Sequence, residues 1–367
     1  MKIALVHDYL REYGGAERVL EALHQLYPNA PVYVGFVDWR SLGIHADRFK
    51  NWHITETWIR RLPFYKKLYS PYRVFAPKAF AALDLSAFDI VISSSNAYFA
   101  KSIRVPHGTH FCYCHTPPRA LYGYATMSNW KANPVTRVIG TIMNHFLRIV
   151  DFYAAQRVDR FIANSHETAR RITKFYRRES VVVHPPVALV DQAAATRTKL
   201  VPLKERKYFL YVNRLALAKH PEIAVRVCSE LNIPLKVVGE GKMLAGLKEM
   251  AGPGVEFLGA VDDATLSHVY ANAQALLYPV EDEDFGIVPV EAMAFGTPVI
   301  AHRSGGPKET IQHGKTGILF ENLTADGLKK AVADFTKVSF SVDYIQKHAQ
   351  AFSTKTFMQA IQALLLQ

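Results

Sequence analysis

Two carboxylates lie on either side of a Phe-Gly pair in the segment from Glu283 to Glu291. A short apolar run ending at Tyr278 precedes this acidic segment, and an apolar run with helical spacing follows it. Pro289 is tolerated in the first turn of a helix, and Gly296 is suited to end one. We therefore expect Glu283 on a loop and Glu291 on the next helix, accepting hydrogen bonds from hydroxyl groups on two parts of one ligand.

The expected helix start between these carboxylates offers unpaired backbone N–H groups, which attract anions. A glycosyl group and a ribose joined by phosphates would satisfy both the carboxylates and the helix start. Taken alone, the carboxylate pair also fits a solvated acidic loop before an ordinary helix. The Phe-Gly turn favours the ligand interpretation, and the predicted binding segment comprises Asp284, Phe285, Gly286, Ile287 and Val288.

Arg214 and Lys219 follow one expected strand and precede a helix, so both cations can lie at the mouth of a binding cleft. Two fixed cations would neutralise a diphosphate and stabilise the charge that grows on a leaving group. Exposed bases at a helix start are the simpler alternative for either residue alone.

Two pairs of glycines follow strand-like runs. Gly14 and Gly15 would let backbone N–H groups approach a phosphate or a sugar, and Gly239 and Gly241 would leave room for a nucleotide base. Neither pair forms the G-x-G-x-x-G pattern of dinucleotide binding, so a dehydrogenase is set aside.

A Cys-x-Cys-His cluster at the end of another strand raises the question of zinc. Strand alternation sends Cys112 and Cys114 to one face and His115 to the other, and no fourth ligand pairs with them. We therefore expect no bound metal.

Composition indicates a globular protein of two domains: the chain has 367 residues, of which 49% are hydrophobic and 21% charged. No signal peptide or bilayer-spanning segment is evident, and residues 138–155 are predicted to form an amphipathic helix. Three cysteines fit a reducing cytoplasm better than a disulfide framework.

The net charge is unevenly distributed. Residues 1–187 hold 25 Lys and Arg against 13 Asp and Glu, which gives +12, whereas residues 188–367 hold 19 of each. Bases alternate with aromatic residues from Trp58 to Arg73, which suits an anionic membrane surface and equally suits a solvated basic face over buried rings. No nucleic-acid-binding module accompanies the charge.

Strands and helices alternate along both halves, which predicts an α/β protein with two parallel sheets whose ligands bind at the carboxyl ends of the strands. We expect two Rossmann-like domains around a central interdomain cleft. The expected domains are residues 1–187 on the acceptor side and residues 188–350 on the nucleotide-sugar side, joined by a linker at 191–207. Residues 351–367 are expected to form a helix that packs back towards the first domain.

Several motifs together resemble the retaining GT-B glycosyltransferases of family 4. The first is the Glu283–Glu291 segment with its Ala-Met-Ala-Phe-Gly-Thr-Pro-Val-Ile continuation. The others span nearly the whole chain: Gly14-Gly-Ala-Glu-Arg18, Cys114-His-Thr-Pro-Pro-Arg119, Ala163-Asn-Ser165, His184-Pro-Pro186, Asn213-Arg-Leu-Ala-Leu-Ala-Lys219, Val238-Gly-Glu-Gly241 and Ser304-Gly-Gly306. The Gly-Gly-Ala-Glu-Arg and His-Thr-Pro-Pro-Arg segments are most similar to bacterial mannosyltransferases of polysaccharide and O-antigen assembly.

The resemblance implies sugar transfer with retention of configuration and without a metal, because Arg214 and Lys219 perform the cation's task. It implies that His115 faces the donor sugar near the reacting carbon, where it would bind the sugar and support the transition state. The expected catalytic residues are therefore His115, Arg214, Lys219 and Glu283. The expected donor is GDP-mannose, with a UDP-sugar as the alternative, and the expected acceptor is a lipid-linked or polysaccharide precursor. The enzyme would lie in the cytoplasm on the inner face of the membrane. A nucleotide-sugar epimerase and a non-catalytic membrane-docking scaffold are the other candidates, and Asp284 and Lys308 depart from the family's pattern.

Overall fold

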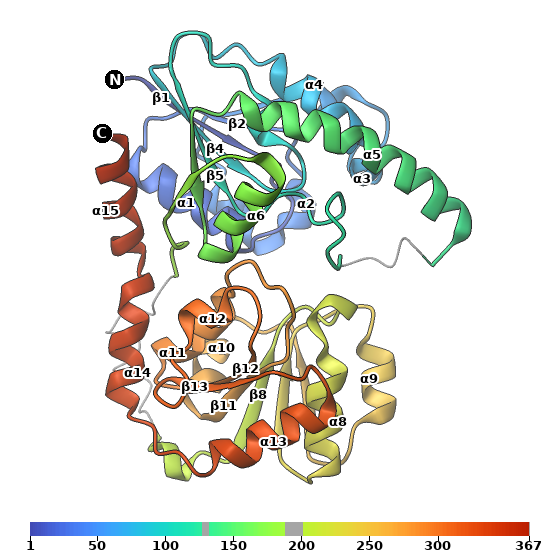
Figure 1. The fold of residues 1–367 in the computed structure, drawn as a ribbon, viewed down its shortest axis with the longest axis vertical. Coiled ribbons are helices and arrows are strands. Elements are labelled where there is room, and N and C mark those ends of the chain that lie inside the picture. Colours follow the sequence, from blue (N-terminus) through green and yellow to red (C-terminus); the bar gives the residue numbers. More distant parts are fainter. Residues whose placement is uncertain (127–131, 188–200, 367) are drawn as a thin grey trace. The chain divides into compact units, whose positions relative to one another are not determined.

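The computed structural model describes residues 1–126, 132–187 and 201–366 (Figure 1). The chain divides into two compact units. Unit 1 comprises residues 1–125, 129–186 and 357–367, and unit 2 comprises residues 126–128 and 187–356. Each unit is built around its own parallel sheet.

The sheet of unit 1 has seven strands in the order β3-β2-β1-β4-β5-β6-β7, and every pairing is parallel. Its strand order reverses between β1 and β4. The strands are β1 (Ile3–His7), β2 (Val32–Val34), β3 (Ile54–Glu56), β4 (Ile90–Ser95), β5 (Thr109–Cys114), β6 (Arg160–Ala163) and β7 (Ser180–Val182).

Helices cover both faces of this sheet, so its strands are apolar on both sides. Leu5 of β1 belongs to a cluster that includes residues of α1 and α15, and its neighbours Ala4 and Val6 belong to a cluster that includes residues of α4 and α5. The α-helices are α1 (Gly15–Leu26), α2 (Trp39–Leu42), α3 (Tyr69–Tyr72), α4 (Ala76–Ala81), α5 (Pro134–Gln156), α6 (His166–Tyr176) and α15 (Thr354–Leu365). The 3-10 helices are η1 (Gly43–Arg48), η2 (Trp58–Arg61), η3 (Arg73–Phe75) and η4 (Ala100–Ser102).

Capping residues mark the start of α5, the longest helix of unit 1, and buried apolar residues anchor α15 in the same unit. Asn133 caps α5 by accepting from the backbone N–H of Val135 at 2.9 Å, and Pro134 occupies the first turn. Phe357 and Ile361 of α15 are buried in the same cluster as Leu5.

In the part of the chain that is described, no helix is both long enough and apolar enough to cross a bilayer.

The sheet of unit 2 has six parallel strands in the order β10-β9-β8-β11-β12-β13. They are β8 (Tyr208–Val212), β9 (Leu235–Val238), β10 (Val255–Gly259), β11 (Ala273–Tyr278), β12 (Val299–His302) and β13 (Gly317–Phe320). The α-helices are α8 (Pro221–Glu230), α9 (Leu244–Met250), α10 (Asp263–Ala271), α11 (Ile287–Ala294), α12 (Pro307–Thr310), α13 (Ala325–Phe335) and α14 (Val342–Ala349). The 3-10 helices are η5 (Leu203–Glu205), η6 (Leu217–Lys219) and η7 (Gln350–Phe352).

The prediction of an α/β chain with two Rossmann-like halves is confirmed. Two edge strands, β3 and β13, were not predicted. All three residues of β3 are only half-buried, so that strand shows no apolar run, whereas β13 is a buried apolar run that the sequence did offer. Residues 191–200, which are most of the expected linker at 191–207, lie outside the described residues. The rest of it contains the turn η5.

Candidate functional site

The strand order of unit 2 reverses between β8 and β11, which lie side by side in the middle of the sheet. Ligands of parallel α/β sheets bind outside the carboxyl ends of the strands at such a reversal. The segment after β8 carries Arg214 and Lys219, and the loop after β11 carries Glu283. The fold therefore brings three predicted site residues to the same edge of one sheet.

Lys219 and Glu283 join these two segments through an ion pair. The Nζ atom of Lys219 donates to Oε2 of Glu283, and only 10% and 16% of the two side chains are exposed. The carbonyl of Lys219 accepts from the hydroxyl of Tyr211 at 2.9 Å, which ties the turn to β8. Because both side chains are largely shielded from water, their charges are weakly screened and interact strongly with a phosphate or a sugar hydroxyl that binds beside them.

Two buried tyrosines lie around the carboxylate of Glu283. Burial, with a smaller contribution from Glu283, raises the pKa of Tyr278 well above its usual range. Burial, followed by Glu222 and Glu283, does the same for Tyr211. Both phenols stay neutral at physiological pH and keep their O–H donors.

Two glycines hold the acidic loop in place. The N–H of Gly306 donates to the carbonyl of Glu283 at 2.8 Å. A Cβ atom at Gly306 would lie 2.2 Å from the carbonyl oxygen of Phe285, and one at Gly305, where φ is +58°, would lie 2.1 Å from that of Glu283. Backbone contact thus leaves no room for a side chain at either glycine, and this contact positions Glu283.

Glu291 has a different partner from Glu283. Helix α11 begins after Gly286, whose φ of +85° makes the sharp turn that the sequence predicted. One turn into α11, Oε2 of Glu291 accepts from the hydroxyl of Tyr270, on α10, at 3.1 Å. Phe285 is buried in the core, and the rest of the predicted segment is half-buried: Asp284, Ile287 and Val288.

Arg214 is exposed next to Asn213, and a glycine turn supports its loop. A Cβ atom at Gly239 would lie 2.0 Å from the carbonyl oxygen of Asn213, and one at Gly241 would lie 2.1 Å from that of Leu215. Both glycines are therefore required for packing against the segment after β8. Their predicted role in making room for a base stays a prediction.

Unit 1 contains a buried polar chain at the reversal point of its own sheet. The Oγ atom of Ser94, on β4, lies 3.0 Å from Nδ1 of His7, on β1, and 2.8 Å from Nε2 of His115, after β5. One hydroxyl has one hydrogen, so Ser94 can donate to at most one of the two rings, and at least one histidine must donate its N–H to Ser94, which couples the tautomers of the two histidines. Burial, with a smaller effect of His7, lowers the pKa of His115 to about 3, so this ring is neutral.

Glu17 extends this chain to the glycine loop. Its Oε1 atom lies 3.5 Å from Nε2 of His7, and its Oε2 atom accepts from the backbone N–H of Gly14 at 2.8 Å. Gly15 is the first residue of α1. The N–H of Gly14, which we expected to approach a phosphate or a sugar, is thus occupied by a carboxylate, and a hydroxyl suits this position better than a second anion.

The two cysteines of the Cys-x-Cys-His cluster are part of the hydrophobic core. Cys112 and Cys114 are buried with residues of α6, and burial raises the pKa of Cys112 to about 12, which disfavours the metal-binding thiolate. Within the described residues, no three His, Cys, Asp or Glu side chains are placed to share a metal ion. Metal-independent activity stays a prediction.

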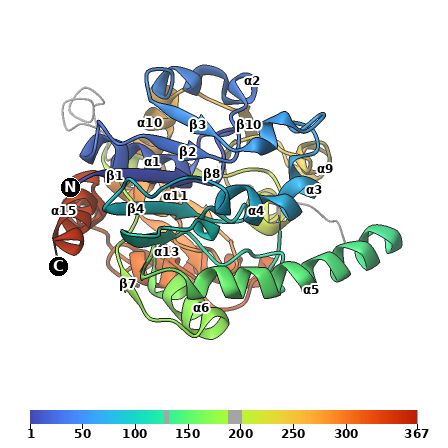
Figure 2. The ribbon, with the colours of Figure 1, turned by 90° about the horizontal axis from the view of Figure 1, so that it is seen from above.

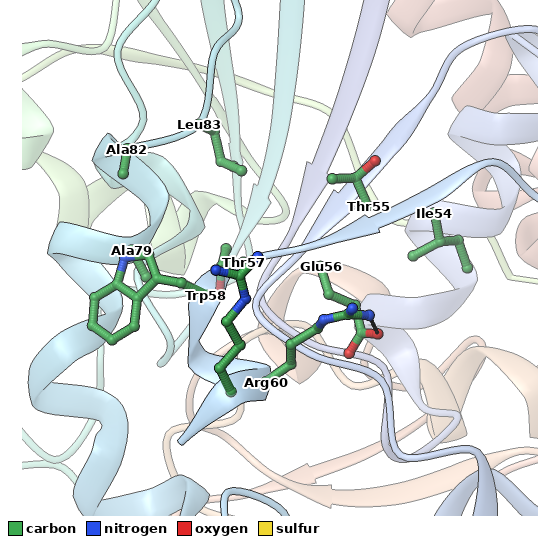
Figure 3. A pocket seen from close by; sticks show the side chains of 10 residues that line it. Ile54, Thr55, Glu56, Thr57, Trp58, Arg60, Ala79, Ala82 and Leu83 are labelled. Carbon is green, nitrogen blue, oxygen red and sulfur yellow. Dashed lines mark hydrogen bonds and ion pairs between the residues drawn. The ribbon is translucent and has the colours of Figure 1, made fainter.

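A hollow of about 450 Å³ lies elsewhere in unit 1, beside the edge strand β3 (Figure 3). Arg60 lines it, but its guanidinium donates to Oε1 of Glu56 at 3.3 Å. Arg61 lines the same hollow, which thus carries two arginines but none of the site residues predicted from the sequence.

Two family models together match most of the chain. The model described as Glycosyltransferase Family 4 matches residues 13–190, and the model described as Glycosyl transferases group 1 matches residues 193–352. The chain joins a Family 4 glycosyltransferase domain to a group 1 glycosyl transferase domain. The Family 4 domain contains His115 and Gly14, and the group 1 domain contains Arg214, Lys219 and Glu283.

Curated relatives match mainly over part of the chain. A D-inositol 3-phosphate glycosyltransferase from Streptomyces avermitilis is 30% identical over 229 residues, which are 55% of this chain and 47% of that protein. A glycogen synthase from Thermus thermophilus is 32% identical over 149 residues, which are 38% of this chain and 33% of that protein. The matches thus span about half of these relatives' length or less.

Solved structures share the fold across the chain. The apo lipopolysaccharide outer core galactosyltransferase WaaB has a TM-score of 0.69 at 18% identity, covering 100% of this chain and 99% of that one. Sucrose-phosphate synthase from Thermosynechococcus elongatus has a TM-score of 0.71 at 19% identity, covering 100% and 98%. Anabaena Alr3699/HepE, in complex with UDP-glucose, has a TM-score of 0.67 at 17% identity, covering 100% and 99%. The predicted GT-B fold is confirmed.

The sequence did not reveal the partners of the predicted residues. His7, Ser94 and Tyr270 were not singled out, and Glu17 was noted only as part of a motif. A signal for the first two was present, because each ends or nearly ends an apolar strand that lies beside the reversal point of the sheet. Tyr270 gave none, since it belongs to a helix of ordinary composition.

Proposed function

We propose that this protein is a glycosyltransferase whose group 1 domain binds a nucleotide diphosphate sugar at the carboxyl ends of β8 and β11. The observation that carries the proposal is the poorly exposed Lys219–Glu283 pair, which joins the two strands at the reversal point. A cation next to a carboxylate offers one group to the diphosphate and one to sugar or ribose hydroxyls.

The two cations have different expected roles. Arg214 is exposed to solvent, where it would meet a phosphate of the donor, whereas Lys219 would exchange part of its contact with Glu283 for a phosphate oxygen. Both would stabilise the charge that develops on the departing diphosphate. Glu291, held by Tyr270, would accept from a second hydroxyl.

We further propose that the reaction retains the configuration of the sugar. The bond from the anomeric carbon to the diphosphate oxygen breaks, the acceptor oxygen attacks from the same face, and the leaving phosphate oxygen receives the acceptor's proton. His115 and the Gly14–Gly15 loop would bind the donor sugar. Because His115 is neutral and Gly14 is capped by Glu17, these groups suit hydroxyl recognition.

The proposed donor is GDP-mannose and the proposed acceptor a lipid-linked or polysaccharide precursor at the cytoplasmic face of a membrane. Both follow from the Gly-Gly-Ala-Glu-Arg and His-Thr-Pro-Pro-Arg motifs. A UDP-sugar is the second candidate, supported by the structural neighbour in complex with UDP-glucose.

A thermal-shift series with GDP, UDP, ADP and their sugar conjugates tests the proposal, because a ligand that binds the folded state raises its Tm. We expect a shift with GDP and GDP-mannose and slow release of mannose from the latter. A shift with UDP-sugars alone would correct the donor. No shift with any nucleotide, beside intact vesicle binding, would favour the non-catalytic scaffold.

A further inference from the structure

Helix α5 has an apolar stripe on the side that faces away from unit 1. Its buried residues are Asn144, Leu147, Asp151, Ala154 and Ala155. On the opposite side, apolar residues recur at intervals of three and four, as one face of a helix requires. The stripe consists of Val135, Val138, Ile139, Ile142, Phe146, Ile149, Val150 and Tyr153, whose exposed fractions run from 41% to 65%.

The inner contacts of α5 fix its rotation, so the stripe cannot turn into the core. Asp151 accepts from the Nζ atom of buried Lys101 and, at 2.8 Å, from the hydroxyl of Tyr122. Asn144 donates to the carbonyl of Ala120 at 3.2 Å. Rotating α5 would separate Asp151 from Lys101, and leaving these buried charges unpaired would cost several kcal/mol of stability. Figures 1 and 2 show α5 running along the outside of unit 1, with its N-terminal end projecting beyond the sheet.

The stripe continues onto the neighbouring segment. Val74, on η3, lines an apolar hollow of about 340 Å³ together with residues of α5. Phe75, the next residue of η3, is 41% exposed. The Tyr65 and Tyr69 rings of the segment from Trp58 to Arg73, in contrast, are half-buried and lie against Phe36.

Positive charge surrounds this apolar surface. Apart from the buried Asp151, the charged residues of α5 are Arg137 and Arg148, and both are exposed. In the segment from Trp58 to Arg73, Arg61 and Lys67 are exposed, and Arg60 and Lys66 are exposed bases that pair with Glu56 and Asp38. Two copies joined through this face would bring like charges together, whereas anionic lipid headgroups would neutralise them.

We propose that the outer face of α5, with Val74 and Phe75, is the surface by which this protein docks on an anionic lipid bilayer. The helix lies in the plane of the interface, its stripe reaches the acyl boundary, and the bases contact lipid phosphates. The inference rests on the proposed function only in that a membrane-bound acceptor gives docking a purpose.

The experiment compares the full chain with I142S/F146S, which removes two stripe residues without changing charge. The matched control is Ile44→Ser, because Ile44 is 84% exposed in the same unit but lies on η1, outside the stripe. Vesicles are made of phosphatidylcholine alone and of phosphatidylcholine with roughly equal phosphatidylglycerol. Circular dichroism checks that each variant folds, and a second stripe variant, V138S/I139S, guards against one that does not.

We expect the unchanged protein and the Ile44→Ser control to bind anionic vesicles alike, less tightly as salt rises, and the stripe variants to lose about tenfold or more in partitioning. Equal binding by the stripe variants would overturn the proposal. The proposal would also be overturned if the unchanged protein formed a dimer, the stripe variants were monomeric, and none of them bound vesicles. The nucleotide-induced Tm shift is measured in parallel, so its loss with docking intact would instead count against the proposed function.

Discussion

Replacing Lys219 by Met and Glu283 by Gln, singly and together, tests whether the two residues act as a unit. Either single change leaves a charge that is mostly buried without its opposite, since 10% and 16% of the side chains are exposed. The double change removes both charges. A pair that acts together predicts that the two single effects do not add.

The burial of the pair sets the magnitude. Removing one partner of a fully buried pair costs about 3–5 kcal/mol, and exposed pairs contribute about 0–1 kcal/mol. For side chains that keep a little water contact, we expect each single change to destabilise unit 2 by about 2 kcal/mol. The double variant should lose about 1–2 kcal/mol less than the sum of the single losses.

The assay must report on unit 2 alone. None of the four tryptophans lies beyond residue 130, so tryptophan fluorescence does not follow the unfolding of unit 2. Hydrogen exchange of peptides from β8 and β11 in increasing urea gives the free energy of opening instead. Strictly additive losses in the two single variants and the double variant would refute a functional ion pair.

Three further predictions concern glycines, pH and metals. Gly306→Ala should destabilise unit 2 by about 2 kcal/mol or more, because the new Cβ would lie 2.2 Å from the carbonyl oxygen of Phe285. At Gly14 the atom nearest to a new Cβ is 3.4 Å away. Gly14→Ala should therefore unfold like the unchanged protein but lose donor turnover. Urea unfolding and initial rates separate the two, and a comparable stability loss in both would contradict the structure. Burial lowers the pKa of His110 and His115 to about 3, below the unfolded value, so the unfolded state binds more protons as pH falls. Stability should therefore decline from about pH 6.5 downwards, by up to about 1.4 kcal/mol per pH unit for each histidine, and a flat profile between pH 6.5 and 4.5 would be inconsistent with neutral buried rings. Sugar transfer should persist in excess EDTA. Complete loss of activity that Mg²⁺ or Mn²⁺ restores would show that Arg214 and Lys219 alone do not neutralise the leaving diphosphate.

The alternation of apolar runs with helical segments was enough to predict the α/β class and most strands, because both sheets are parallel and buried on both faces. Helix α11 was predictable for a different reason, because backbone restrictions act locally. Gly286 makes the turn before the helix, Pro289 is accepted in its first turn, and Gly296 follows its end. The edge strand β3 has no buried residue and is held by its pairing with β2, so local sequence does not reveal it.

The site was predictable in its residue types and less so in its contacts. Arg214 and Lys219 looked alike in the sequence, yet one is exposed and the other is held by Glu283, because only the tertiary fold brings the segment after β8 against the loop after β11. The same limit applies to Gly14, whose N–H is occupied by a carboxylate from its own helix. The apolar stripe of α5 was also missed as a surface, since an amphipathic pattern does not say which face is buried.

Peptide-resolved hydrogen exchange of the full chain, with and without GDP-mannose, tests most directly where the nucleotide sugar binds. Slower exchange is expected in the segments 213–220 and 281–288, which carry Lys219 and Glu283 at the ends of β8 and β11. Unchanged exchange in both segments, at a ligand concentration that raises the Tm, would place the nucleotide sugar elsewhere and contradict binding at this sheet edge.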